Sequence, residues 1–177
     1  AFGEVGHWLG EGVSPCRCGR RGCLEVALGL ETLVKRYRAL GGTASTLEGL
    51  LAGARAGEEA ALLALRQLGE ALGRFLANLA VAYDPARVVV GGRVAELFPF
   101  LEASLRASLQ AHAFLEAHRR LPVAPSVYGH LAPAVGGASL FLARFFELGG
   151  LWAEGPRRNG GEGYAEVAFG DRYGLGA

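Results

Sequence analysis

Three cysteines and one histidine near the N-terminus have the residue types and spacing of a metal site. His7 is followed by Cys16, Cys18 and Cys23 within the next sixteen residues. One imidazole nitrogen and three thiolate sulfurs form the donor set of a closed tetrahedral zinc site, in which no coordination position stays open for chemistry. The pattern therefore predicts a structural Zn²⁺ ion held by His7, Cys16, Cys18 and Cys23.

The residues between these donors favour the same interpretation. Gly19 and Gly22 let the chain turn sharply enough to aim three sulfurs at one point. The segment also holds three arginines, Arg17, Arg20 and Arg21. They are placed to offset the net negative charge of such a site and to lower the pKa values of the thiols. We predict a zinc loop over residues 7–23; the alternative is three ordinary cysteines of a reduced cytosolic protein.

Composition and charge exclude several classes of protein. The 177 residues are 51% hydrophobic with a mean hydropathy of +0.25, which suits one domain or one large lobe with a substantial core. The net charge of +1 gives no field that would draw the chain onto nucleic acid or an anionic membrane. No apolar run approaches the roughly 18 residues of a membrane helix, and the first residues lack the features of a signal peptide. We expect a cytoplasmic protein without membrane contact.

Helical periodicity dominates the elements that follow these donors. Apolar residues recur at helical spacing from Leu24 to Leu40, which predicts one helix there. Ser45 or Thr46 is expected to cap a short helix. A long amphipathic helix is predicted over Glu58–Tyr83, because Asp84-Pro85 then ends it.

Strands and helices alternate in the second half of the chain. A strand is predicted at Arg87–Val90, followed by a turn at Gly91-Gly92 and a helix over Val94–Arg119. A second strand at Pro122–Tyr128 and a helix at Ala132–Glu147 continue the pattern. This alternation indicates an α/β fold. Beyond it, we predict a linker or loop at residues 148–163 and a strand with a glycine turn at residues 164–177.

Two motifs resemble those of a known family. Gly3-Glu4-Val5-Gly6-His7, followed by Cys16-x-Cys18-Gly19-x-x-Gly22-Cys23-Leu24-Glu25, resembles the two-part motif of the ROK family of bacterial repressors and sugar kinases. Further similar segments are residues 78–85, 88–92 and 129–143. The resemblance covers residues 1–147 and implies the C-terminal, sugar-binding lobe of an actin-like, ribonuclease H-like fold of the ATPase type, as part of a homo-oligomer, dimer or tetramer.

The resemblance also implies roles for individual residues. Glu4, His7 and Glu25 would contact hydroxyls of a bound monosaccharide, with His7 offering one ring nitrogen to zinc and the other to the sugar. Carboxylates accept hydrogen bonds from adjacent hydroxyls, and a metal-fixed imidazole presents its second nitrogen in a set direction. Without the resemblance, Glu4 would be a surface charge and Glu25 a charge favoured at a helix N-terminus.

The resemblance leaves a kinase and a repressor open. Kinases of the family carry a phosphate loop and a catalytic aspartate in an N-terminal lobe, and neither precedes Ala1, so this chain alone is not expected to phosphorylate a sugar. These kinases usually show three consecutive glycines at the turn near the nucleotide, whereas this chain has Gly91-Gly92-Arg93. A side chain at the third position crowds the approach of a phosphate. Arg93 therefore favours the sugar-binding effector domain of a transcriptional repressor that lacks its DNA-binding part.

Two alternatives remain for the function. One is the C-terminal half of an ATP-dependent sugar kinase of the glucokinase or fructokinase type; ATP would then contact Gly91, Gly92, Gly174 and Gly176. The other is a purely structural zinc module.

The tail at residues 164–177 resembles family sequence that normally precedes Gly3-Glu4, so it is either a permuted segment or an unrelated extension.

Overall fold

The computed structural model describes residues 4–10 and 12–145. It falls into two units, residues 1–133 and 134–177, each of which is described by itself. The elements in chain order are η1 (Val5–His7), α1 (Leu24–Ala27), α2 (Leu30–Ala39), α3 (Leu47–Arg55), α4 (Glu59–Tyr83), β1 (Val88–Val90), α5 (Val94–His112), α6 (Glu116–Arg119), β2 (Val123–Pro125), η2 (Gly129–Leu131) and α7 (Ala132–Phe145). The linker and strand predicted at residues 148–177 lie outside the described residues.

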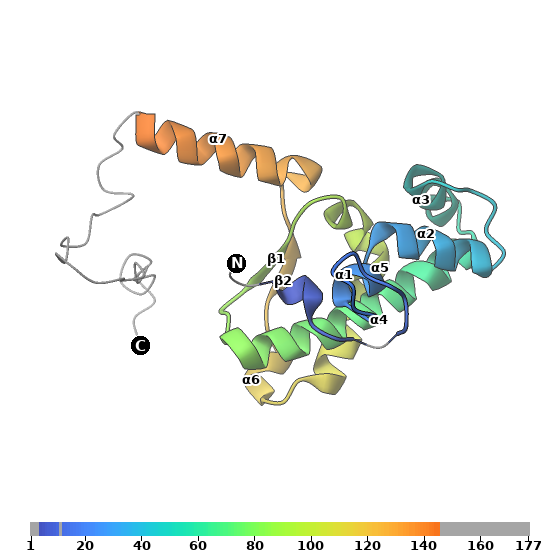
Figure 1. The fold of residues 1–177 in the computed structure, drawn as a ribbon, viewed down its shortest axis with the longest axis horizontal. Coiled ribbons are helices and arrows are strands. Elements are labelled where there is room, and N and C mark those ends of the chain that lie inside the picture. The colour runs from blue at the N-terminus through green and yellow to red at the C-terminus, as the bar shows by residue number, and fades with distance from the viewer. Residues whose placement is uncertain (1–3, 11, 146–177) are drawn as a thin grey trace. The chain divides into compact units, whose positions relative to one another are not determined.

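Two long helices, α4 and α5, pack along each other at the centre of the first unit (Figure 1). Their contact is close because α4 presents glycines to α5. A β-carbon at Gly73 would lie 2.5 Å from the carbonyl oxygen of Leu105, and one at Gly69 would lie 2.6 Å from that of Leu101. Leucines on both helices are fully buried beside this contact: Leu65, Leu68, Leu97, Leu101 and Leu105.

Helices α2 and α3 cover the N-terminal half of α4. Tyr37 on α2 is 1% exposed, and its hydroxyl donates to the Glu58 carboxylate at 2.9 Å and accepts the backbone N–H of Thr43 at 3.2 Å. A buried hydroxyl with both of its roles filled fixes α2 against the start of α4. Thr46 caps α3 by accepting the N–H of Gly49 at 3.2 Å, as the sequence predicts.

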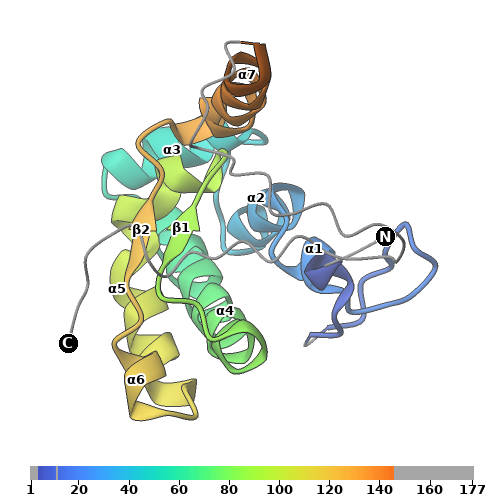
Figure 2. The same ribbon diagram turned by 90° about the vertical axis from the view of Figure 1, so that its left-hand side faces the viewer.

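Strands β1 and β2 form a two-stranded parallel sheet (Figure 2). Val88 pairs with Val123, and α5 and α6 make the crossover that parallel strands require. The α/β prediction is therefore confirmed in its coarse form: the described part is mostly helical, with a parallel sheet. None of its helices combines the length and the apolarity that crossing a membrane would take.

Three predicted elements are wrong in their extent. The helix expected over Leu24–Leu40 is divided, because Gly29 is extended and ends α1 before α2 begins. The helix expected over Val94–Arg119 ends at His112, whose Nδ1 lies 2.8 Å from the carbonyl oxygen of Ser108 and so takes up an acceptor of the last turn. The strand expected over Pro122–Tyr128 is confined to Val123–Pro125.

The long helix α4 agrees with its predicted bounds. It ends at Asp84, which adopts a left-handed conformation with φ 43° and precedes Pro85, whose ring cannot continue a helix. The Asp84 carboxylate accepts a hydrogen bond from Nε2 of the buried His118 at 3.0 Å, which ties this helix end to α6. The helix predicted at Ala132–Glu147 is present as α7 within the described residues.

Candidate functional site

The segment 7–23, termed the cysteine loop below and described except at residue 11, folds back on itself as a short hairpin. Cys16 donates its backbone N–H to the carbonyl of Arg20 at 2.8 Å, and Pro15 forms an antiparallel bridge with Arg21. Gly22 has φ 76°, and a β-carbon there would lie 2.5 Å from the carbonyl oxygen of Gly12. Only glycine fits this position without moving the backbone, so Gly22 lets the chain return to place Cys23 beside the hairpin.

The hairpin brings the four predicted ligands together. The donor atoms of His7, Cys16, Cys18 and Cys23 all lie within 4.8 Å of one another. The Sγ atoms of Cys18 and Cys23 are 3.5 Å apart, and Sγ of Cys16 is 3.7 Å from Nδ1 of His7. Bond lengths of about 2.3 Å for sulfur and about 2.1 Å for nitrogen give tetrahedral edges of about 3.6 to 3.8 Å. The donor types and these two edges fit a zinc ion.

Two thiols of the cluster have opposite pKa shifts. The backbone N–H and the guanidinium of Arg20 hydrogen-bond Cys18 and lower its pKa to about 6. Burial, followed by hydrogen bonds with Cys18 and Cys16, raises the pKa of Cys23 to about 11. Without metal, Cys18 therefore gives up its proton more readily than Cys23. Binding a metal must displace the Cys23 proton, so metal affinity increases with pH.

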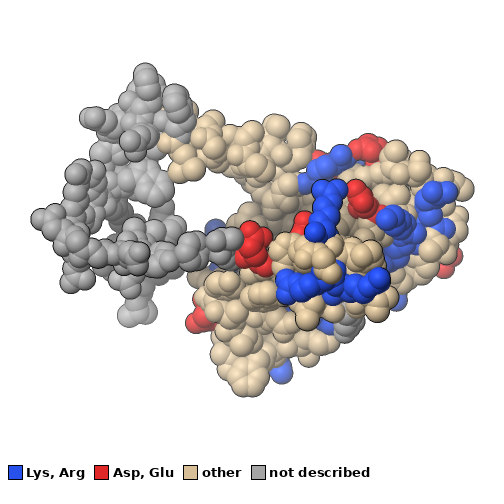
Figure 3. Space-filling view, in the orientation of Figure 1, with Lys and Arg blue, Asp and Glu red and all other residues tan. Residues whose placement is uncertain are grey.

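Arg20 is the arginine that the structure places against the cluster. Its Nη2 donates to the carbonyl of His7 at 2.8 Å, which joins the hairpin tip to the segment carrying the histidine ligand. Arg21 instead donates to the carbonyl of Val13 at 3.1 Å. Figure 3 shows basic side chains gathered on one face of the molecule. Arg17, Arg20 and Arg21 of the cysteine loop are all exposed. Of the three arginines, Arg20 is therefore the one whose positive charge most directly compensates the predicted negative charge of the cluster.

His7 also contacts Glu25, one of the residues predicted to bind a sugar. Its Nδ1 lies 3.5 Å from Oε2 of Glu25, the acidic residue in the first turn of α1. A β-carbon at Gly6 would lie 3.4 Å from the Glu25 β-carbon, an ordinary van der Waals contact, so the backbone beside His7 lies next to the first turn of α1. Glu4 is exposed at the start of η1, the short helix that ends at His7, and its carbonyl accepts the His7 N–H at 3.0 Å. Because Nδ1 faces the Cys16 sulfur, Nε2 is the nitrogen left for another partner.

Trp8 anchors the cysteine loop on α4, a contact that the sequence pattern does not indicate. Its ring stacks on Tyr83 with centroids 6.3 Å apart and an interplanar angle of 10°, and it meets Phe75 edge-on. The carbonyl of Trp8 accepts the N–H of Leu24 at 3.0 Å, where α1 begins. The tryptophan therefore links the metal ligands, the helix of Glu25 and the central helix pair.

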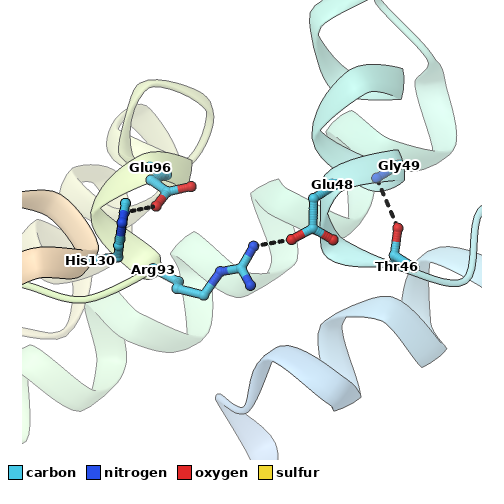
Figure 4. Close-up of polar contacts among 6 residues, drawn as sticks. All are labelled: Thr46, Glu48, Gly49, Arg93, Glu96 and His130. Atoms are coloured by element: carbon cyan, nitrogen blue, oxygen red, sulfur yellow. Dashed lines mark hydrogen bonds and ion pairs between the residues drawn. The ribbon is translucent and has the colours of Figure 1, made fainter.

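The second predicted site is the turn after β1. Gly92 has φ 67°, which explains a glycine there, and its N–H donates to the carbonyl of Gly129 at 3.1 Å. Figure 4 shows the Arg93 side chain extended toward α3, where its guanidinium pairs with Glu48. This hydrogen bond lowers the pKa of the Glu48 carboxyl. Gly174 and Gly176, the other predicted nucleotide contacts, lie outside the described residues.

Arg93 spans one side of an open cleft of about 430 Å³ between α2 and α3. Lys35 and Arg38 line the same cleft, together with apolar side chains of both helices. A second ion pair next to the turn joins His130 to Glu96 at 3.0 Å, so the first turn of α5 is fixed to the segment that follows β2 (Figure 4). The prediction that Arg93 crowds the turn remains untested; in this structure its guanidinium is held by Glu48.

Comparison with known proteins defines the class to which this fold and site belong. A solved ROK family glucokinase from Streptomyces griseus, in complex with glucose and AMPPNP, matches 78% of this chain with a TM-score of 0.68 and 26% identity. The xylose repressor of Bacillus subtilis is 26% identical over 147 residues, or 82% of this chain. The kanosamine kinase of Amycolatopsis mediterranei is 32% identical over 138 residues, or 77% of this chain.

The family model described as "ROK family" matches residues 1–144. The chain therefore belongs to the ROK family, and the predicted resemblance is confirmed. It covers 38% of the xylose repressor, 45% of the kanosamine kinase and 51% of the glucokinase, so it spans about half or less of these relatives. Both repressors and sugar kinases are among its relatives, and the choice between them is argued below.

Proposed function

We propose that this chain is the sugar-binding part of a ROK transcriptional repressor, in which a structural zinc ion holds His7 and Glu25 in place for a monosaccharide. The observation that carries the proposal is that His7 joins two groups. Its Nδ1 is 3.7 Å from the Cys16 sulfur and 3.5 Å from the Glu25 carboxylate. Fixing the metal ligands thereby fixes the orientation of the imidazole beside a carboxylate that can accept sugar hydroxyls.

The proposed sugar site consists of Glu4, His7 and Glu25, and the sugar-binding lobe extends over residues 1–147. Zinc in this site has a structural role, because a fourth protein donor leaves no position open for substrate. When bound, the ion would supply a fixed positive centre that orders the cysteine loop. The residues of the chain itself then perform the recognition: His7 directs Nε2 toward the ligand, and the two carboxylates accept hydrogen bonds.

A repressor is favoured over a kinase by Arg93. The position holds a third glycine in the kinase pattern described above, whereas here a guanidinium pairs with Glu48 across the cleft beside the turn. A phosphate approaching this turn has to displace or share that pair. We propose that the protein is a cytoplasmic homo-oligomer and that DNA binding, if present, belongs to a part of the protein outside residues 1–177.

The alternative is the C-terminal half of an ATP-dependent sugar kinase, supported by the kanosamine kinase and glucokinase relatives. Sequencing the gene upstream of the codon for Ala1 discriminates between the two. A helix-turn-helix segment in frame would support the repressor. An Asp-x-Gly-Gly-Thr phosphate loop in frame would overturn it in favour of the kinase, with Gly91 and Gly92 at the nucleotide.

Sugar binding itself is tested by thermal unfolding of the zinc-loaded protein with D-xylose, D-glucose and N-acetyl-D-glucosamine, the sugars that the names of these relatives mention. A ligand that binds only the folded state raises the melting temperature in proportion to its concentration relative to Kd. One sugar of such a panel should produce a saturable rise. No shift with any of the three sugars would contradict the proposed sugar site and favour the structural zinc module.

Removing the Glu25 carboxylate is expected to weaken sugar binding strongly. We predict that Glu25→Ala lowers affinity by roughly 10- to 150-fold, equivalent to about 1.5 to 3 kcal/mol for a hydrogen bond to a charged group. Isothermal titration with the sugar that shifts the wild type measures this loss. Glu31→Ala is the matched control, because Glu31 also sits in the first turn of a helix and contributes the same favourable dipole interaction.

The control separates ligand contact from helix stability. Equal loss of affinity in Glu25→Ala and Glu31→Ala would mean that Glu25 acts only as a helix charge. Unchanged affinity in Glu25→Ala would remove it from the site altogether. The proposed geometry requires that Glu25→Ala alone loses affinity while zinc content stays at wild-type level.

A further inference from the structure

We propose that the cysteine loop is a peroxide-sensitive switch, in which oxidation joins Cys18 to Cys23, expels the zinc ion and weakens sugar binding. The effect on sugar rests on the proposed function above. The thiol and metal steps rest on the geometry of the cluster alone and can be measured independently of any sugar.

The cluster is asymmetric in its exposure. Cys18 is exposed at the hairpin tip, whereas Cys16 is 8% exposed and Cys23 is fully buried. A small oxidant dissolved in water therefore meets Cys18 before the other two sulfurs, and site-selective oxidation follows access. Cys18 is therefore both a ligand that the metal site requires and the sulfur that solvent reaches.

The cluster is also asymmetric in its contacts. The Cys18 sulfur lies 3.5 Å from the Cys23 sulfur, while the Cys16 sulfur, which is within 4.8 Å of both, has Nδ1 of His7 at 3.7 Å. A sulfenic acid formed on Cys18 thus has a second sulfur in van der Waals contact, placed to resolve it. Cys16 and Cys18 are separated by a single residue, which strains a disulfide between them, and Cys16 is directed to His7.

The chemistry needs one molecule of hydrogen peroxide per disulfide. The Cys18 thiolate attacks one peroxide oxygen, the O–O bond breaks, hydroxide leaves, and the sulfur becomes a sulfenic acid after a two-electron oxidation. The Cys23 thiolate then attacks the Cys18 sulfur, the S–O bond breaks, a second hydroxide leaves, and the S–S bond forms. With two protons taken up from water, two thiolates and peroxide yield a disulfide and two waters.

Disulfide formation removes two of the four metal donors. His7 and Cys16 alone are an incomplete set for zinc, so the ion is released. Cys23 is also the residue that precedes α1, the helix of Glu25, and its backbone pairs with Leu9. Covalent capture of Cys23 by the hairpin tip therefore acts directly on the segment that holds Glu25 against His7. A reductant with added zinc reverses the change.

The experiment treats zinc-loaded protein with one equivalent of hydrogen peroxide and follows zinc release with a metallochromic dye. Trypsin then assigns the bond, because cleavage after the arginines of the loop separates the three cysteines into residues 1–17, 18–20 and 22–35. We expect one zinc released per chain, with peptide 18–20 joined to peptide 22–35. Dithiothreitol and zinc should restore both the metal content and the melting temperature.

Cys18→His is the matched variant, because it keeps a zinc donor at the exposed position but cannot form a disulfide. It should hold zinc and release it at least tenfold more slowly under peroxide than the wild type does. Zinc retention by oxidised wild type, a disulfide to Cys16, or only irreversible sulfinic products would overturn the proposal. If Cys18→His fails to load zinc, peptide mapping of the wild type still decides the question.

Sugar binding is measured last, on reduced and oxidised wild type. The proposal requires at least a tenfold weaker affinity after oxidation. If the reduced, zinc-loaded chain binds no sugar at all, the proposed function fails, while the peroxide step is judged on zinc and peptides. If sugar binds equally well to both forms, the link between oxidation and sugar affinity is wrong even when zinc is lost.

Discussion

Cys23→Ser should abolish stoichiometric zinc binding and disorder the cysteine loop while the helical core stays folded. Cys23 is fully buried among the other donors, and a serine hydroxyl is a poor replacement for a thiolate on zinc. The binding energy of a structural zinc ion, ~10 kcal/mol or more in zinc-finger peptides, is folding energy for the segment that it organises. The apolar core on α2 to α5 includes none of the four ligands, so we expect it to fold without the ion.

The local nature of this effect is measurable through Trp8. Of the two tryptophans in the sequence, Trp152 is replaced by phenylalanine so that emission reports the stacking of Trp8 on Tyr83. We expect Cys23→Ser to have almost no zinc by elemental analysis, red-shifted Trp8 emission, sugar affinity lower by at least about tenfold, and far-UV circular dichroism close to wild type. A chelator should reproduce the same state in the wild-type chain.

Arg17→Ala is the control for Cys23→Ser, since Arg17 is exposed between two ligand cysteines and supplies charge but no donor. It should keep one zinc per chain. Stoichiometric zinc in Cys23→Ser would show that the donor set is wrong. Loss of all helical signal in Cys23→Ser would show instead that the core cannot fold without the loop.

The metal cluster could be predicted from sequence because its constraints are local. Three cysteines within eight residues stay close in space in most conformations of the segment, and Gly19 and Gly22 mark the turns that direct their side chains toward one point. Helix α4 could also be predicted from the sequence, since its apolar periodicity is long and Asp84-Pro85 ends it at a defined residue. The roles of Glu4 and Glu25 came from resemblance alone, because a carboxylate at a helix start has an ordinary explanation.

The parts that escaped prediction depend on contacts between distant residues. Trp8 and Tyr83 are seventy-five residues apart in sequence, and Arg93 meets Glu48 across forty-five. Neither pair has a local signature. The sequence does not indicate the break at Gly29, because Leu24–Leu40 keeps its apolar spacing through a single extended residue. At the end of α5, the break came from a histidine that binds a carbonyl of its own helix.

Gly73→Val should destabilise the fold by about 3 kcal/mol, the upper part of the range for overpacking a close contact. A β-carbon at this position lies 2.5 Å from the Leu105 carbonyl oxygen and 2.8 Å from the Leu109 nitrogen, both of them backbone atoms. Backbone cannot rotate away as a side chain does, so α5 has to move as a body. Leu105 and Leu109, both buried, then lose part of their packing against α4.

Urea unfolding of zinc-loaded protein, followed by circular dichroism, measures this loss, and Gly136→Ala is its control. Among the described residues no atom lies within 4 Å of a β-carbon at Gly136, and alanine is favoured over glycine in a helix, so that variant should match or slightly exceed wild-type stability. Because Phe75 and Tyr83 of α4 support Trp8, Gly73→Val should also shift Trp8 emission before global unfolding. A variant as stable as wild type would mean that α4 and α5 are not in contact at Gly73. Unchanged Trp8 emission in a destabilised variant would mean that the packing of α4 on α5 does not support the cysteine loop.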